Sequence, residues 1–261
     1  MGNYVKIAVS KDSGVAQIKL NSPETMNALA AELFEELESA VRDVSKDDSI
    51  GAVVLTGSGK AFCAGGDLKR FAEGFSPHEG YMYMKRFSSF INCFANMPKP
   101  TVAAVNGYAV GAGFCLALLA DIILASKDAK FGMAFVNVGL IPDFGGLYTL
   151  PRLIGVHKAK ELVMTGRNIS ADEADKMGIL NYVTEPRDLE RESLYMAKRL
   201  ASGPPVAHIM AKLLINASSD MSLDGLLEQE ALMQAQCMQT EDHKDALKSF
   251  FAKEAPLFRG K

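Results

Sequence analysis

The 261-residue sequence contains no tryptophan, only four cysteines and only four histidines. The cysteines show no C-x-x-C spacing and no cluster with histidine, so we expect free thiols in a reducing compartment and no metal site. No apolar run reaches the roughly 18 residues that cross a bilayer. Residues 1–14 also lack the charged-then-apolar pattern of a signal peptide. We therefore expect a cytoplasmic protein.

Strong charge of one sign is also lacking. A net charge of −3 gives no electrostatic reason to expect nucleic acid or an anionic membrane as a partner. The patterns G-x-G-x-x-G and G-x-x-x-x-G-K-[ST] are absent, which argues against dinucleotide and P-loop folds. What remains is a composition of 48% hydrophobic and 23% charged residues, typical of a soluble globular protein.

Strand patterns dominate the first part of the chain. Residues 4–9 and 15–20 alternate around a turn at 11–14 and predict a β-hairpin. Residues 31–44 carry apolar side chains on one helical face. Residues 52–55 predict a buried strand, and residues 81–96 predict a helix.

Helical patterns dominate from residue 147 onward, with a single predicted strand at 180–183. Strands first and helices last indicate a sheet-containing core followed by a helical appendage, which we place at residues 1–195 and 196–261. The last helices carry apolar residues, among them Met221, Met233 and Met238. These side chains need burial against the core or a second subunit, so we expect an oligomer.

Two glycine-rich joints follow predicted strands. Residues 99–121, KPTVAAVNGYAVGAGFCLALLAD, pass from a strand through Gly111-Ala112-Gly113 into an apolar helix. Residues 60–68 form a similar joint. Unpaired N–H groups at a helix start bind negative charge, and glycine lets a ligand approach the backbone. Each joint alone fits a tight strand-to-helix connection equally well.

Several ordered sequence motifs together resemble the crotonase, or enoyl-CoA hydratase/isomerase, superfamily along nearly the whole chain. They are Pro23 with Asn27-Ala28-Leu29, AFCAGGDLK at 61–69, KPTVAAVNGYAVGAG at 99–113, Asp121, Phe131-Gly132, GLIPDFGG at 139–146 and the segment 164–174. The resemblance implies an α/β fold, a spiral of ββα turns with a helical C-terminal trimerisation domain. It also implies trimers or dimers of trimers that bind acyl-CoA thioesters, with no cofactor beyond the CoA of the substrate.

The resemblance also assigns candidate site residues. The amides of Gly66 and Ala112 would form an oxyanion hole for an enolate, where losing one donor can cost roughly 10²–10³ in rate. Acyl-CoA binding is implied for further residues along the chain. These are Ala64, Asp67, Leu68, Lys69 and, at the C-terminus and often across a subunit boundary, Phe250 and Lys253. For the two lysines, a solvated surface role is an equally good interpretation.

The departures from the family pattern decide which reaction is expected. Hydratases of the family use two glutamates. One lies three residues after the second oxyanion-hole residue, and the other lies in the apolar loop before the motif that reads GLIPDFGG here. In this sequence these two positions hold Cys115 and Phe135. Neither is a carboxylate, so ordinary hydration, which divides proton transfers between two acids, is disfavoured. We interpret Cys115 as a small core residue and Phe135 as part of the acyl pocket.

One carboxylate remains in the predicted site, Asp143 in IPDFGG. Its apolar neighbours Pro142 and Phe144 predict burial and a raised pKa, useful to a general base. The alternative is an N-cap for the helix that follows. An aspartate here resembles the isomerase branch of the family, to which the ring-epoxide isomerase of phenylacetate breakdown belongs.

These residues predict an acyl-CoA isomerase. Asp143 would take the C2 proton of a 3-enoyl-CoA, the Gly66 and Ala112 amides would hold the dienolate, and Asp143 would return the proton at C4. Two alternatives stay open: a hydratase-type lyase that uses another base or a substrate-bound water, and a CoA-thioester-binding protein without catalysis. The acyl group is not specified by the sequence.

Overall fold

The computed structural model describes residues 4–10 and 12–261 and has two sheets. The larger sheet has the order β1-β2-β3-β5-β7-β10 and the smaller one β4-β6-β8-β9. The larger sheet comprises β1 (Val5–Ser10), β2 (Val15–Leu20), β3 (Ala52–Gly57), β5 (Thr101–Val105), β7 (Ile122–Ser126) and β10 (Tyr182–Thr184). The smaller sheet comprises β4 (Ala61–Cys63), β6 (Tyr108–Val110), β8 (Lys130–Gly132) and β9 (Asn168–Ser170).

From β3 to β8, successive strands alternate between the two sheets. β3, β5 and β7 pair in parallel in the larger sheet, and the strand after each of them (β4, β6 and β8) pairs in parallel in the smaller one. Each pair therefore forms one turn of a ββα spiral, which confirms the expected fold class. This arrangement matters for the site because every turn brings a strand-to-helix joint to the same region.

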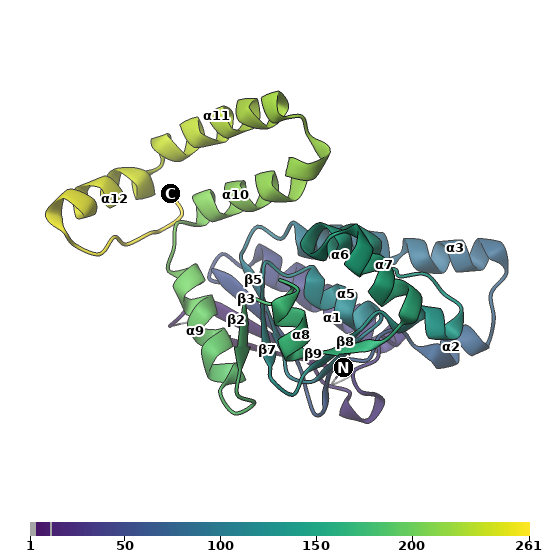
Figure 1. Cartoon of the computed structure of the whole chain (residues 1–261). Helices are drawn as coiled ribbons and strands as arrows, with labels where there is room; N and C mark the ends of the chain where they lie inside the picture. Colours follow the sequence, from purple (N-terminus) through teal and green to yellow (C-terminus); the bar gives the residue numbers. More distant parts are fainter. Residues whose placement is uncertain (1–3, 11) are drawn as a thin grey trace.

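Helices cover the sheets on both sides (Figure 1). They are α1 (Ala31–Lys46), α2 (Leu68–Ala72), α3 (Pro77–Lys85), α4 (Phe87–Ala95), α5 (Ala112–Leu118), α6 (Gly146–Ile154), α7 (Val156–Thr165), α8 (Ala171–Lys176) and α9 (Leu189–Ala201). Alternate residues of β3 point to opposite faces: Val53 and Leu55 join the main core with α1, whereas Val54 packs with α9.

Three further helices, α10 (Pro205–Ala217), α11 (Leu223–Gln239) and α12 (Glu241–Ala252), project from the core. The expected boundary after residue 195 falls inside α9, which packs on the larger sheet, and the projecting helices follow it. Lys212 of α10 is tied to the core by an ion pair with Asp121 at 2.8 Å. The buried Asp242 carboxylate accepts hydrogen bonds from the backbone N–H groups of Arg259 and Gly260. Gly260 lies beside Pro205, the first residue of α10, so the C-terminal residues pack against the start of that helix.

Most predicted elements lie where the sequence pattern places them, with two differences. The β1–β2 hairpin is antiparallel as predicted, although Lys11 of its turn lies outside the described residues. The predicted helix 81–96 is instead two helices, because α3 ends and α4 begins at Arg86. The strands of the smaller sheet were not predicted, because each has only three residues and merges with a glycine turn or loop.

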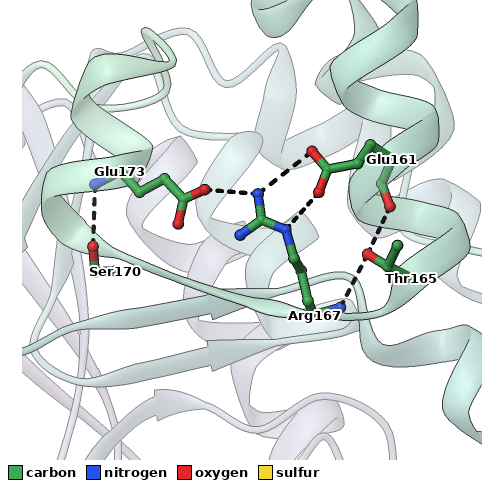
Figure 2. A network of polar contacts seen from close by, with 5 residues as sticks. All are labelled: Glu161, Thr165, Arg167, Ser170 and Glu173. Carbon is green, nitrogen blue, oxygen red and sulfur yellow. Dashed lines mark hydrogen bonds and ion pairs between the residues drawn. The ribbon is translucent and has the colours of Figure 1, made fainter.

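A surface network joins α7, β9 and α8. The Arg167 guanidinium donates to Glu161 at 2.5 Å and to Glu173 at 2.6 Å (Figure 2). These partners hold the pKa of Arg167 above its ordinary value, although Glu161 is exposed and the other two side chains are only partly buried. In the described part of the chain, no helix has the length and hydropathy to cross a membrane.

Candidate active site

The two expected oxyanion-hole amides follow glycines with positive φ. Gly65, before Gly66, has φ +103°, and Gly111, before Ala112, has φ +54°. A Cβ on Gly65 would lie 2.8 Å from the Val110 carbonyl oxygen and 3.4 Å from the Ala112 nitrogen. The two glycine joints are therefore in direct contact. Among the described residues, neither the Gly66 nor the Ala112 N–H donates a backbone hydrogen bond.

A buried asparagine fixes the loop that supports the first amide. Asn27 is fully buried with φ +57°, and its side-chain NH₂ donates to the carbonyls of Ser58, Ala61 and Phe62 at 2.8–3.2 Å. Two residues after Asn27, the Leu29 N–H donates to the Gly65 carbonyl at 2.8 Å. Satisfying these buried polar groups holds the Gly65–Gly66 peptide in one orientation.

Asp143 is positioned by the residue that follows it. Phe144 has φ +48°, which is rare for a residue with a side chain, and Gly145 continues with φ +75°. The Phe144 ring is buried, with its centroid 5.1 Å from that of Phe87 and 6.1 Å from that of Phe34. Burial of this ring offsets the backbone strain and anchors Asp143 in the wall of a cavity.

The Asp143 carboxylate lies in an apolar setting. Its Oδ1 is buried and has no hydrogen-bond partner among the described residues. Burial raises the pKa of Asp143 to about 6. The alternative role as a helix cap is wrong, because the residue at the N-cap of α6 is Gly145 and no side chain caps this helix. A carboxyl group that changes charge close to neutral pH is suited to accept and return a proton.

Asp143, Gly66 and Ala112 line one small cavity. Its volume is about 10 Å³, enough for about one water molecule. The other lining residues are mostly aromatic: Leu29, Phe71, Tyr83, Phe87 and Phe144. The sequence indicates that residues 71–94 help to shape the acyl pocket, but it singles out neither Phe71 nor Tyr83. The spacing of Tyr83, Phe87, Phe90 and Phe94 on a helical pattern was the available signal for Tyr83, and it is shared with core residues.

The two positions where hydratases carry glutamate hold apolar side chains that are buried. Cys115 has no exposed surface, and burial together with the charge of Asp143 raises its thiol pKa well above the ordinary value. Cys115 is therefore a neutral core residue, as expected. Phe135 is also buried, but it is not among the residues that line the cavity. Its ring instead lies against Gly111, behind the Ala112 amide.

The expected CoA-binding residues fall into two groups. Asp67 accepts the Lys69 N–H at 3.0 Å and caps α2, while Leu68 and Lys69 are exposed next to Gly66. Ala64 precedes this segment, and its N–H donates to the Met26 carbonyl at 3.0 Å. Phe250 and Lys253 are exposed at the end of α12, at the opposite side of the chain from α2 (Figure 1). Within one chain the two groups do not come together.

A ββα spiral that brings paired backbone amides and a partly buried acid to one cavity has the groups needed to hold an oxyanion and to move a proton beside it. The chain matches the model of the family "Enoyl-CoA hydratase/isomerase" over residues 10–261. The chain therefore belongs to the enoyl-CoA hydratase/isomerase family, which confirms the resemblance of its motifs.

Relatives and solved structures agree with this assignment. A probable enoyl-CoA hydratase of Rhizobium meliloti is 38% identical over 98% of this chain and 99% of its own length. The 1,2-epoxyphenylacetyl-CoA isomerase of Escherichia coli is 36% identical over 96% of this chain and 97% of its own. The structure of an enoyl-CoA hydratase from Bacillus anthracis matches with a TM-score of 0.93 at 33% identity, covering 99% of this chain and 100% of that one.

Proposed function

We propose that the protein is an enoyl-CoA isomerase in which Asp143 is the acid–base residue. The observation that carries this proposal is one partly buried carboxylate, Asp143, whose Oδ1 is buried without a hydrogen-bond partner among the described residues, in the cavity that Gly66 and Ala112 also line. Moving a double bond needs one proton carrier and an oxyanion hole, whereas hydration also needs an activated water. The buried Cys115 and Phe135 supply no second carboxylate.

The proposed reaction has two proton transfers. Asp143, ionised at neutral pH because its pKa is about 6, accepts the C2 proton of a 3-enoyl-CoA. The electron pair of the broken C–H bond spreads over C2–C4 and the thioester oxygen, which becomes an oxyanion held by the Gly66 and Ala112 N–H groups. The protonated Asp143 then returns the same proton to C4, which leaves a 2-enoyl-CoA.

The remaining site assignments belong to the same proposal. Ala64, Asp67, Leu68 and Lys69 are sequence neighbours of Gly66, and in this proposal they hold the adenine and pantetheine part of CoA. Proton transfer through an enolate requires no redox or metal cofactor, so CoA enters only as part of the substrate.

We also propose a homotrimer or a dimer of trimers, working in the cytoplasm. In the single chain, Phe250, Phe251 and Leu223 of α11 and α12 are between 70% and 79% exposed. Burial of these side chains by a neighbouring subunit would stabilise the projecting helices. It would also allow Phe250 and Lys253 to reach CoA bound to that neighbour.

The test compares wild type, Asp143→Asn and Asp143→Glu on trans-3-hexenoyl-CoA. Loss of the general base lowers turnover by about 10²–10⁴-fold, so Asp143→Asn should lose this much kcat, with partial recovery in Asp143→Glu. Asp43→Asn is the matched control, because Asp43 lies on the exposed side of α1. Full isomerase activity in Asp143→Asn would refute the proposal.

Hydration of a 2-enoyl-CoA is the second candidate function. It is favoured by the names of several relatives, which are hydratases. Rapid water addition to crotonyl-CoA by the wild type would favour this alternative. Tight binding of thioesters with neither reaction would favour a non-catalytic CoA-thioester-binding protein.

A further inference from the structure

The first residue of α6, Gly146, is packed so closely that no side chain fits on it. Gly146 is buried and has a negative φ, a backbone conformation that any residue adopts. A Cβ on it would lie 2.5 Å from the Cys115 Sγ, closer than non-bonded atoms come. The next neighbours, Pro142 and Met133, would be at ordinary contact distances of 3.5 and 3.6 Å. Among the described residues, Cys115 is therefore the neighbour that keeps position 146 free of a side chain.

Cys115 lies on the helix that presents the second oxyanion-hole amide. Ala112 is the first residue of α5, and Cys115 follows about 4.5 Å further along the helix axis. The Cys115 thiol donates to the Met133 Sδ at 3.8 Å, and neither side chain has any exposed surface. In a close-packed interior the thiol has no free space into which to retreat. It is therefore a fixed contact point close to the Ala112 amide.

The backbone that carries Asp143 rests on this contact point. The Gly146 N–H donates to the Asp143 carbonyl at 2.8 Å and closes a turn in which Phe144 and Gly145 have positive φ. The buried Phe144 ring holds the same turn from inside the core. The charge of Asp143 contributes to the raised pKa of the Cys115 thiol, in keeping with a short separation between the two groups. The turn and the thiol therefore fit together as one unit.

We propose that Cys115 is a positioning residue whose thiol, packed against Gly146, sets the separation between the Asp143 carboxylate and the Ala112 amide. Helix α5 carries the amide and the thiol, and the turn before α6 carries the carboxylate, so the thiol acts as a spacer between the two halves of the site. A misplacement of about 1 Å in an active site can cost about 10²-fold in rate. This inference rests on the proposed function in giving Asp143 its catalytic role, and it deepens that function by naming the contact that aligns the acid with the oxyanion hole.

The test is a double-mutant cycle of wild type, Gly146→Ala, Cys115→Ala and the double variant. In Gly146→Ala the new Cβ meets the thiol and pushes the turn away from α5. Its kcat on trans-3-hexenoyl-CoA should fall about 10²-fold while KM stays within about threefold. In the Cys115→Ala background the obstructing sulfur is gone, so Gly146→Ala should cost less than about threefold in kcat. Gly80→Ala is the matched control, because a Cβ on this helical glycine would have its nearest neighbour at 3.6 Å, and it should keep its kcat.

A second measurement does not depend on turnover. The pKa of Asp143 is measured by ¹³C NMR of protein labelled at the aspartate carboxyl carbons, with the resonance assigned from Asp143→Asn. In wild type it should be about 6. Gly146→Ala should lower this pKa, because the displaced turn admits water to the carboxylate, and the double variant should restore it. If the thiol only filled space, the variants would lose stability without moving this pKa.

Unchanged kcat and pKa in Gly146→Ala, or a double variant as impaired as Gly146→Ala, would overturn the inference. Should Gly146→Ala not fold, a double variant that folds with the kcat of Cys115→Ala carries the same support, and one that does not fold overturns the inference. A restored pKa in a protein that isomerises no thioester would refute the proposed function and leave the contact between Cys115 and the Asp143 turn standing. An active isomerase without coupling between positions 115 and 146 would refute only the role of Cys115.

Discussion

Replacing Asp143 with asparagine should stabilise the protein while it removes activity. Burial raises the pKa of this carboxyl from 3.8 to about 6, so the folded state binds its proton more tightly than the unfolded state does. Stability is therefore lost as pH rises from about 4 to about 6, and the full cost, about 3 kcal/mol, is present above pH 7. Asparagine carries no charge and avoids this cost.

The free energy of unfolding should accordingly rise in Asp143→Asn by about 3 kcal/mol at pH 8 and by about half as much at pH 5. Urea unfolding of wild type, Asp143→Asn and Asp43→Asn at both pH values measures these differences. Asp43→Asn should show no comparable gain, since Asp43 is exposed. An Asp143→Asn variant that is less stable than wild type at pH 8, or equally affected at both pH values, would refute the reasoning.

Three further predictions follow from the same geometry. The wild-type kcat/KM for a 3-enoyl-CoA should rise with pH through about 6, as Asp143 ionises; a pH profile that is flat between 5 and 7 would contradict this. Gly65→Ala should lower kcat by about 10²-fold, because its Cβ would lie 2.8 Å from the Val110 carbonyl oxygen and force the Gly66 amide to move. Gly74→Ala is the control, since Gly74 also has a positive φ (+81°) but has no atom within 4 Å of an added Cβ, and it should keep its activity. Arg167→Ala should cost less than about 1 kcal/mol in urea unfolding and leave kcat unchanged, because its ion pairs are solvent-exposed; a larger loss would mean that the network in Figure 2 supports the core.

Local sequence patterns predicted the elements whose side chains alternate or repeat over a full strand or several helical turns. β2 has the predicted bounds, and α1 buries one apolar face as its spacing indicates. The four strands of the smaller sheet have three residues each, too few for a period-2 pattern. The predicted helix 81–96 is interrupted at Arg86, which keeps helical backbone angles. Because the interruption contains neither proline nor glycine, the sequence gives no signal for it.

The backbone groups of the site could be predicted from sequence motifs. The side chains that line its cavity could be predicted less well, because tertiary packing determines their positions. The glycines before Gly66 and Ala112 indicated both joints, and the apolar neighbours of Asp143 indicated its burial. Phe135 was expected in the acyl pocket; its ring lies against Gly111, and it is not among the residues that line the cavity.

Whether Asp143 carries the proton can be seen by following the hydrogen at C2. Wild type and Asp143→Asn are each given trans-3-hexenoyl-CoA carrying deuterium at C2, and the product is examined by mass spectrometry and NMR. If one buried carboxylate carries the proton, wild type should give a 2-enoyl-CoA of unchanged atomic composition with deuterium at C4, and Asp143→Asn should give almost no product. A product heavier by one water, or an isomer formed equally fast by Asp143→Asn, would contradict the account.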